Sequence, residues 1–183
     1  MHKLLLFVAL CLTITAQAQQ RKCHQLIKES HKLNSGSRIG GVPRLVIPVT
    51  VPAATEALFY AVQATKKELP PFVDLAAQIL KRLRENPVKT AANMVQYAAS
   101  VQGAMGNAPV DVYITDQQGS QLFLNKQPFN AFPDANRMNM TAGTIGVEVE
   151  YSLLPVTYYI CLRNPAAVES IEVSLEVVTV GKH

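Results

Sequence analysis

Two histidines and a cysteine near the start of the chain have the side chains that a zinc site needs, but not the spacing. His24 and His31 are seven residues apart. On a helix, that separation places them roughly 10 Å apart along the axis. One Zn²⁺ needs its ligands near 2 Å, so the pair cannot share an ion there, and Cys23 beside His24 adds little. We therefore expect no metal site.

Two pairs of carboxylates have the residue types for Ca²⁺ binding or acid–base catalysis. Asp111 and Asp116 are separated by five residues, so strand alternation places them on opposite faces, and Asp116 is expected to cap a turn. Glu148 and Glu150 share a strand face roughly 7 Å apart, a separation also found in glycosidases. They continue an ordinary alternation, however, and the chain has no Trp to form a sugar platform. We expect a solvated sheet face, no catalytic residue and no cofactor.

A long loop carries the best candidate binding surface. Residues 125–140 are rich in Asn, Pro and Phe, which is typical of a functional loop. The candidate surface consists of Phe129, Asn130, Phe132 and Arg137. The alternative is that the two Phe side chains plug one end of the fold.

The composition places this chain among globular proteins. Of the 183 residues, 49% are hydrophobic and 16% are charged, which excludes wholesale disorder and provides one domain with a core. The formal charge of +4 is too small to argue for a nucleic-acid partner. The basic residues are concentrated in segment 19–44, which is interpreted either as a solvated tail or as a contact with an anionic surface or polysaccharide.

Residues 1–18 have the pattern of a secretory signal peptide. A basic start at Lys3 precedes an apolar run from Leu4 to Ile14, and Ala16-Gln17-Ala18 matches the small-x-small cleavage site. Cleavage is expected after Ala18, or within about two residues of it. No later segment is apolar and long enough to be a membrane helix. We expect a secreted or periplasmic protein.

The remaining pattern predicts strands, then helices, then strands. Period-two alternation predicts strands at 45–51, 110–115, 145–151, 157–163 and 171–177, and the apolar run 57–64 predicts another. Helical periodicity over 72–84 and 88–102 predicts a hairpin insertion packed by Phe72, Ile79, Leu80 and Leu83. Residues 20–33 are interpreted as a short helix. Residues 116–119 are interpreted as a tight turn before a return strand at 121–124, and the even-numbered positions of the last strand as solvated.

These elements predict a mainly β fold class, an antiparallel β-sandwich with an inserted α-helical hairpin at 72–102. The sandwich is expected to cover residues 45–183 as one domain, after a basic N-terminal segment at 19–44. Its type is expected to be jelly-roll or GOLD-like.

Three segments carry a family resemblance. They are Asp111-Val-Tyr-Ile-Thr-Asp116-x-x-Gly119, Tyr159-Ile-Cys161-Leu-Arg-Asn164 and Val173-x-Leu175-x-Val177. They resemble the GOLD-type β-sandwich of p24 cargo proteins and, less closely, bacterial pre-peptidase C-terminal domains. The chain departs from the p24 pattern in having no membrane helix, coiled coil or cytoplasmic tail, so the cargo-sorting role does not carry over.

The resemblance also implies a disulfide. In the GOLD-type family, a cysteine on the strand of Cys161 pairs with an earlier one, and Cys23 is the candidate partner. After cleavage these are the only two cysteines left, in a compartment that oxidises thiols. Two free thiols or an intermolecular bond are the alternatives.

Together, the patterns predict an exported, non-enzymatic binding protein. Its partner is expected to be a protein or an envelope surface, rather than nucleic acid. The alternatives are a secreted enzyme or enzyme inhibitor with a site in its loops, and a purely structural envelope protein.

Overall fold

The computed structural model describes residues 21–85, 91–98, 101, 106–150 and 152–182. The expected signal peptide at 1–18 lies outside the described residues. Within them, no helix is both long enough and apolar enough to cross a bilayer.

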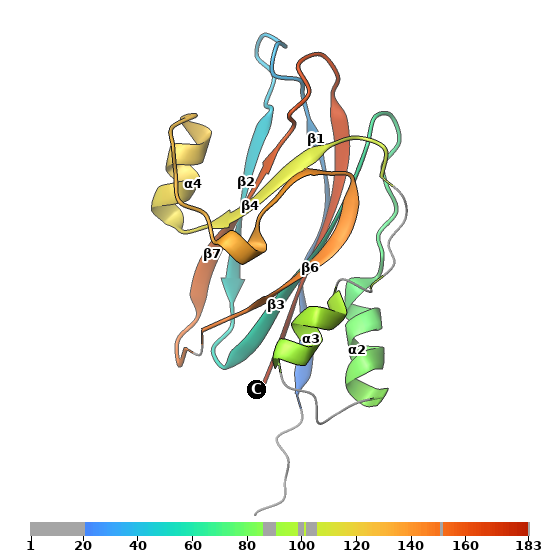
Figure 1. Ribbon diagram of the computed structural model, residues 1–183, viewed down its shortest axis with the longest axis vertical. Helices are drawn as coiled ribbons and strands as arrows, with labels where there is room; N and C mark the ends of the chain where they lie inside the picture. The colour runs from blue at the N-terminus through green and yellow to red at the C-terminus, as the bar shows by residue number, and fades with distance from the viewer. Residues whose placement is uncertain (1–20, 86–90, 99–100, 102–105, 151, 183) are drawn as a thin grey trace, which may run out of the picture.

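Eight antiparallel strands form two packed sheets (Figure 1). The first sheet has the order β1-β8-β3-β6 and the second has the order β2-β7-β4-β5, which is the strand order of a jelly roll. The strands are β1 (Lys22–Leu33), β2 (Arg44–Val51), β3 (Thr55–Thr65), β4 (Val110–Thr115), β5 (Arg137–Met140), β6 (Ala142–Glu148), β7 (Val156–Arg163) and β8 (Ile171–Gly181). The expected sandwich is confirmed.

The main core lies between the two sheets, and strand alternation sets which side chains enter it. Tyr158, Ile160 and Leu162 of β7 face inward, opposite Leu58 and Tyr60 of β3. The residues between them therefore point to the outer faces of the sheets. Helices cover part of both outer faces, so several outward side chains are also buried.

Helices α2 (Leu75–Glu85) and α3 (Ala91–Ala98) cover the outer face of the first sheet, as expected for the inserted hairpin (Figure 1). Ile79 and Leu83 are buried there, whereas Leu80 is only half-buried. The Arg82 guanidinium stacks on the Tyr97 ring at 4.3 Å and joins the two helices. Gly146 of β6 allows the close approach of α3, because a Cβ there would lie 2.8 Å from the Val95 Cα.

The even-numbered side chains of β8 were predicted to be solvated, and this prediction is wrong for Ser174 and Glu176, which are buried. β8 is a central strand of its sheet, and α2 packs on its outer face. Glu176 is 1% exposed. Its carboxylate accepts backbone N–H bonds from Val73, Asp74 and Leu75 at 2.5, 3.0 and 2.9 Å. These amides precede or begin α2 and have no partner within the helix, so Glu176 binds the N-terminus of α2 to the sheet.

Residues 22–33 of this segment form strand β1, which corrects both the expected helix and the expected separate N-terminal segment. β1 pairs with β8 along its length, with a register shift between Gln25 and Ile27. Leu26 and Ile27 both pack on the main core around that irregularity. A bulge interrupts the period of two, and this made the apolar spacing resemble that of a helix. The sandwich therefore begins at β1, not at residue 45.

Residues 117–124 form helix α4 (Gln117–Leu124) instead of a turn and return strand. Asp116 does cap the element, because its carboxylate accepts the Gly119 N–H at 2.7 Å. A Cβ at Gly119 would lie 1.9 Å from the Thr115 Oγ1. The missing side chain lets α4 fold back tightly on the end of β4.

The expected disulfide between Cys23 and Cys161 is corrected, since both thiols are free. Cys23 lies on the outer face of the first sheet and approaches the Ala76 carbonyl of α2. Cys161 lies on the outer face of the second sheet, between Val46 and Tyr113. The side-chain parity predicted for β7 is correct, but α4 covers that face in place of the N-terminal segment.

The native thiols are expected to alkylate slowly. Burial raises the pKa of Cys23 to about 11 and that of Cys161 to about 12. Since only the thiolate reacts, the Cys23 rate at pH 8 should be about a hundredfold below that of an exposed thiol. Peptide mass spectrometry after iodoacetamide treatment should find Cys23 and Cys161 both labelled in denaturant and almost no label on either in the folded protein. A linked Cys23–Cys161 peptide pair that is lighter by two hydrogen atoms, with no label on either residue in denaturant, would restore the disulfide.

Candidate functional site

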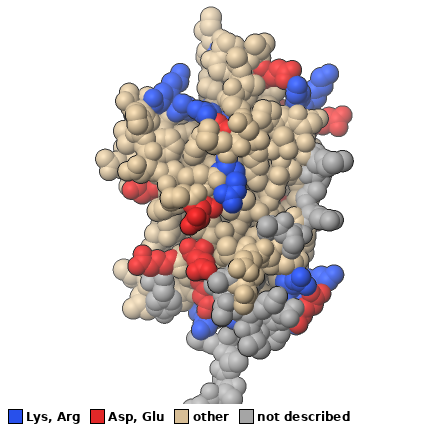
Figure 2. Space-filling model, in the orientation of Figure 1, with Lys and Arg blue, Asp and Glu red and all other residues tan. Residues whose placement is uncertain are grey.

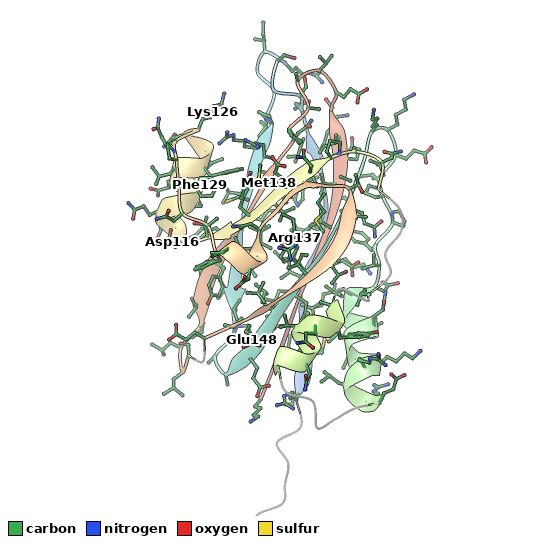
Figure 3. The ribbon with its side chains drawn as sticks, in the orientation of Figure 1. Asp116, Lys126, Phe129, Arg137, Met138 and Glu148 are labelled. Carbon is green, nitrogen blue, oxygen red and sulfur yellow. The ribbon has the colours of Figure 1, made fainter. Side chains whose placement is uncertain are left out.

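A pocket of about 330 Å³ opens on the outer face of the second sheet, beside α4. It is lined by three cationic and three aromatic side chains together with the turn after α4: Arg44, Lys126, Arg163, Tyr113, Phe123, Phe129, Gln127 and Pro128. We call it the basic pocket. Figure 2 shows Lys and Arg side chains near α4 on this side of the molecule, and Figure 3 shows Lys126 and Phe129 beside that helix.

Strand register places the two arginines of the basic pocket in one row with the adjacent Asp111. Arg163 of β7 lies directly between Arg44 of β2 and Asp111 of β4. Asp111 is 1% exposed and accepts from Arg163 through both Nε, at 2.7 Å, and Nη2. Asp111 therefore neutralises Arg163, while Arg44 and Lys126 leave the local formal charge at about +2.

The aromatic side chains form a compact triangle on the wall of the basic pocket. The Tyr113–Phe123, Tyr113–Phe129 and Phe123–Phe129 ring centroids are 5.9, 5.4 and 5.6 Å apart, the last two edge to face. Phe123 is fully buried and anchors the triangle, while Arg44 stacks on its ring at 4.9 Å. The rings present a rigid apolar surface beside the cations.

Burial and the neighbouring charges set the protonation of the basic pocket. Burial, followed by repulsion from Arg163, lowers the pKa of Arg44. Burial opposes the charge of Arg163, but its hydrogen bond and attraction to Asp111 prevail and raise its pKa. Burial and then the Asp111 charge raise the pKa of Tyr113, which keeps its hydroxyl proton at neutral pH. The pocket therefore offers hydrogen-bond donors and positive charge.

Lys126 holds a backbone conformation that normally favours glycine. Its φ is +59°, and it directly follows the C-cap residue of α4. The Lys126 N–H donates to the Phe123 carbonyl at 3.1 Å and the Gln127 N–H to the Leu122 carbonyl at 2.9 Å. This is the Schellman ending of a helix, in which glycine usually occupies the position of Lys126. The lysine thus places a cation at the pocket mouth at a cost in stability.

Replacing Lys126 by Gly is expected to raise the free energy of unfolding by about 1 kcal/mol, because glycine adopts the left-handed conformation without strain. Lys126→Ala removes the same charge but keeps the strain, so its stability should stay close to that of the wild type. Urea titrations of the two variants measure the difference. Equal stability of the two would show that the backbone at residue 126 is not strained.

The structure separates the four residues of the predicted binding surface. Phe129 lines the basic pocket and also a smaller hollow of about 260 Å³, which Asn130 and Asp116 line with it. Phe132 packs on Tyr158 in another pocket. Arg137 donates to the backbone carbonyls of Asp134 and Asn136. Binding by these residues stays a prediction.

The other candidate residues, the metal-ligating and acidic side chains, do not come together as a site. Among the described residues, no three His, Cys, Asp or Glu side chains gather as a group that could hold a metal ion. Glu148 and Glu150 are exposed beside β6, as expected, and Asp111 forms an ion pair instead of an acid–base pair.

Sequence reasoning missed Arg44, Tyr113, Phe123, Lys126 and Arg163. Alternation places Arg44, Tyr113 and Arg163 on the outward side of their strands. The register that makes them neighbours depends on tertiary pairing, which the alternation does not encode.

Comparisons with known proteins find distant structural likeness only. No protein-family model matches the chain, and no curated protein matches its sequence. A solved pre-peptidase C-terminal domain of collagenase from Bacillus anthracis has 9% identity and a TM-score of 0.38, over 81% of this chain and 87% of that one. A family 29 carbohydrate-binding module has 6% identity and a TM-score of 0.34, over 88% and 86%. Scores this low carry no functional argument.

The sandwich assignment therefore rests on the strand pairing of this chain. The resemblance inferred from the sequence is confirmed at the level of a β-sandwich. Its GOLD-type refinement stays a prediction.

Proposed function

We propose that this chain is an exported, non-enzymatic β-sandwich that binds an anionic ligand in the basic pocket. The observation that carries the proposal is the row Arg44–Arg163–Asp111, in which the carboxylate pairs with Arg163 and the neighbouring Arg44 adds a second cation. An incoming carboxylate or sulfate would supply the missing negative charge. Guanidinium forks bind such groups with strong, charge-assisted hydrogen bonds.

The aromatic side chains of the basic pocket indicate what kind of group carries the anion of the ligand. Tyr113 and Phe129 provide an apolar wall beside the cations, and Gln127 adds an amide at the rim. A ligand that carries its anion on a ring, such as an acidic sugar unit, would use both features. We therefore propose an acidic saccharide unit as the ligand class.

The lining of the basic pocket supports binding over catalysis. Among its described lining residues there is no carboxylate, imidazole or thiol, and Tyr113 keeps its proton. Hydrolytic mechanisms generally need a base or nucleophile at the substrate. Export rests on the leader pattern of residues 1–18.

The test is a titration of the protein with D-glucuronate, with D-glucose as the uncharged ring of matched shape. Glucuronate is expected to bind with a Kd of about 1 mM, a usual strength for a small ligand, and glucose at least about tenfold more weakly. Arg44→Ala and Lys126→Ala should each weaken glucuronate binding, whereas Lys81→Ala on the exposed side of α2 should not.

Arg44 also donates to the Phe123 carbonyl, so folding of the Arg44 variant must be checked by its circular dichroism. Lys126 is exposed and provides a second variant without that complication. Equal affinity for the two sugars, or no change on losing either cation, would reject the proposal. Failure to bind either sugar would favour the structural alternative.

A further inference from the structure

A second pocket, of about 400 Å³, lies beside Phe132 and Tyr158 and reaches the core residues Leu58 and Ile114 between the sheets. Its lining comprises apolar residues of both sheets, an aromatic pair and three acids: Leu58, Ile114, Val147, Val149, Phe132, Pro133, Tyr158, Asp134, Glu148 and Glu150. We call it the acidic-rim pocket. Figure 3 shows Glu148 on the lower part of the same face, away from Lys126 and Phe129.

The floor of the acidic-rim pocket is apolar. Leu58 and Ile114 are core residues of opposite sheets, with exposed fractions of 1% and 2%. Phe132 forms one wall by packing edge to face on Tyr158, with ring centroids 5.7 Å apart. The Phe132 side chain nevertheless remains 42% exposed. An apolar group entering this pocket would cover that ring and gain hydrophobic free energy.

The rim of the acidic-rim pocket carries one sign of charge. Asp134, Glu148 and Glu150 are all exposed, and no lining residue is Lys or Arg. The nearby Arg137 donates to backbone carbonyls of Asp134 and Asn136, so it compensates no rim carboxylate by a direct bond. Figure 2 shows acidic side chains grouped on the lower part of this face. The field at this mouth favours cations.

We propose that the acidic-rim pocket binds a basic peptide segment by taking up one aromatic side chain whose neighbours are Lys or Arg. The apolar floor accepts the ring, and the three carboxylates face the flanking cations. Pockets of this size bind ligands of small-molecule dimensions, which suits one large side chain better than a folded surface. This site shares no lining residue with the basic pocket and does not depend on the proposed function.

The experiment uses amide NMR of the full chain with three synthetic probes at physiological ionic strength. Acetyl-Lys-Phe-Lys-amide carries both features, acetyl-Lys-Ala-Lys-amide lacks the ring and acetyl-Glu-Phe-Glu-amide reverses the charge. Only the first is expected to shift the amides of Ile114, Val147 and Val149 in a saturable way.

Variants of the protein then remove the acidic rim and the aromatic wall of the pocket separately. The double variant Glu148→Gln/Glu150→Gln is expected to weaken binding of the first peptide about fivefold, since each exposed ion pair contributes only modestly in water. Glu85→Gln, which removes an exposed carboxylate on α2, is the control and should leave the affinity for the first peptide unchanged. Phe132→Ala should abolish the shifts.

Three outcomes would overturn the inference. They are shifts of equal size with the acidic or the alanine peptide, an unchanged affinity in the double variant, and the absence of shifts with all probes. Glucuronate binding by the double variant is expected to equal that of the wild type, so failure here is distinguishable from failure of the basic pocket.

Discussion

Replacing Glu176 by Ala is expected to lower the free energy of unfolding by about 3 kcal/mol or more. The change removes a buried carboxylate that accepts three backbone N–H bonds at the start of α2. Bonds to a charged group contribute about 1.5–3 kcal/mol, and buried donors without partners add a further cost. Urea unfolding followed by circular dichroism measures the loss.

Glu172 provides the matched control on the same face of β8. Its carboxylate pairs with the exposed Lys32, so Glu172→Ala should cost no more than about 1 kcal/mol. In the Glu176 variant, the amides of residues 73–75 should also exchange with solvent much faster. Similar losses for the two variants would show that Glu176 does not hold α2 on the sheet.

Replacing Phe123 by Ala is expected to lower the free energy of unfolding by about 3–5 kcal/mol and to eliminate glucuronate binding. Phe123 is 1% exposed and connects α4 to the second sheet. Its removal leaves a cavity that the surrounding rings cannot fill without moving. It also removes the surface on which Arg44 stacks.

The neighbouring Leu124 is 50% exposed and provides the control on the same helix. Leu124→Ala should change the free energy of unfolding by less than about 0.5 kcal/mol, the usual range for surface sites, and should keep the ligand. Thermal unfolding combined with the glucuronate titration compares the pair. If Phe123→Ala kept native affinity, the aromatic wall would not be part of the site.

Most of the strands could be predicted from period-two alternation, because one side of each enters the core. That pattern correctly placed Val110–Thr115 and the core parity of β7. It failed for β1, where a bulge disturbs the period. It also failed for the outward side of β8, because alternation does not reveal that a helix will cover a sheet face.

The basic pocket was less accessible to sequence reasoning. Phe129 stood out as an aromatic side chain in a long loop, but its partners come from three strands and the end of α4. The Thr115 Oγ1 donates to the Asn130 carbonyl at 2.7 Å and fixes the loop beside β4. Such long-range contacts decide which residues meet, and no local pattern encodes them.

An amide and side-chain NMR map of D-glucuronate binding to the full chain tests directly whether the basic pocket binds an acidic sugar. We expect saturable shifts confined to Arg44, Tyr113, Lys126, Phe129 and Arg163, and we expect Lys126→Ala to need more glucuronate to reach them. Shifts that cluster elsewhere on the surface, or that D-glucose reproduces at equal concentration, would contradict this expectation.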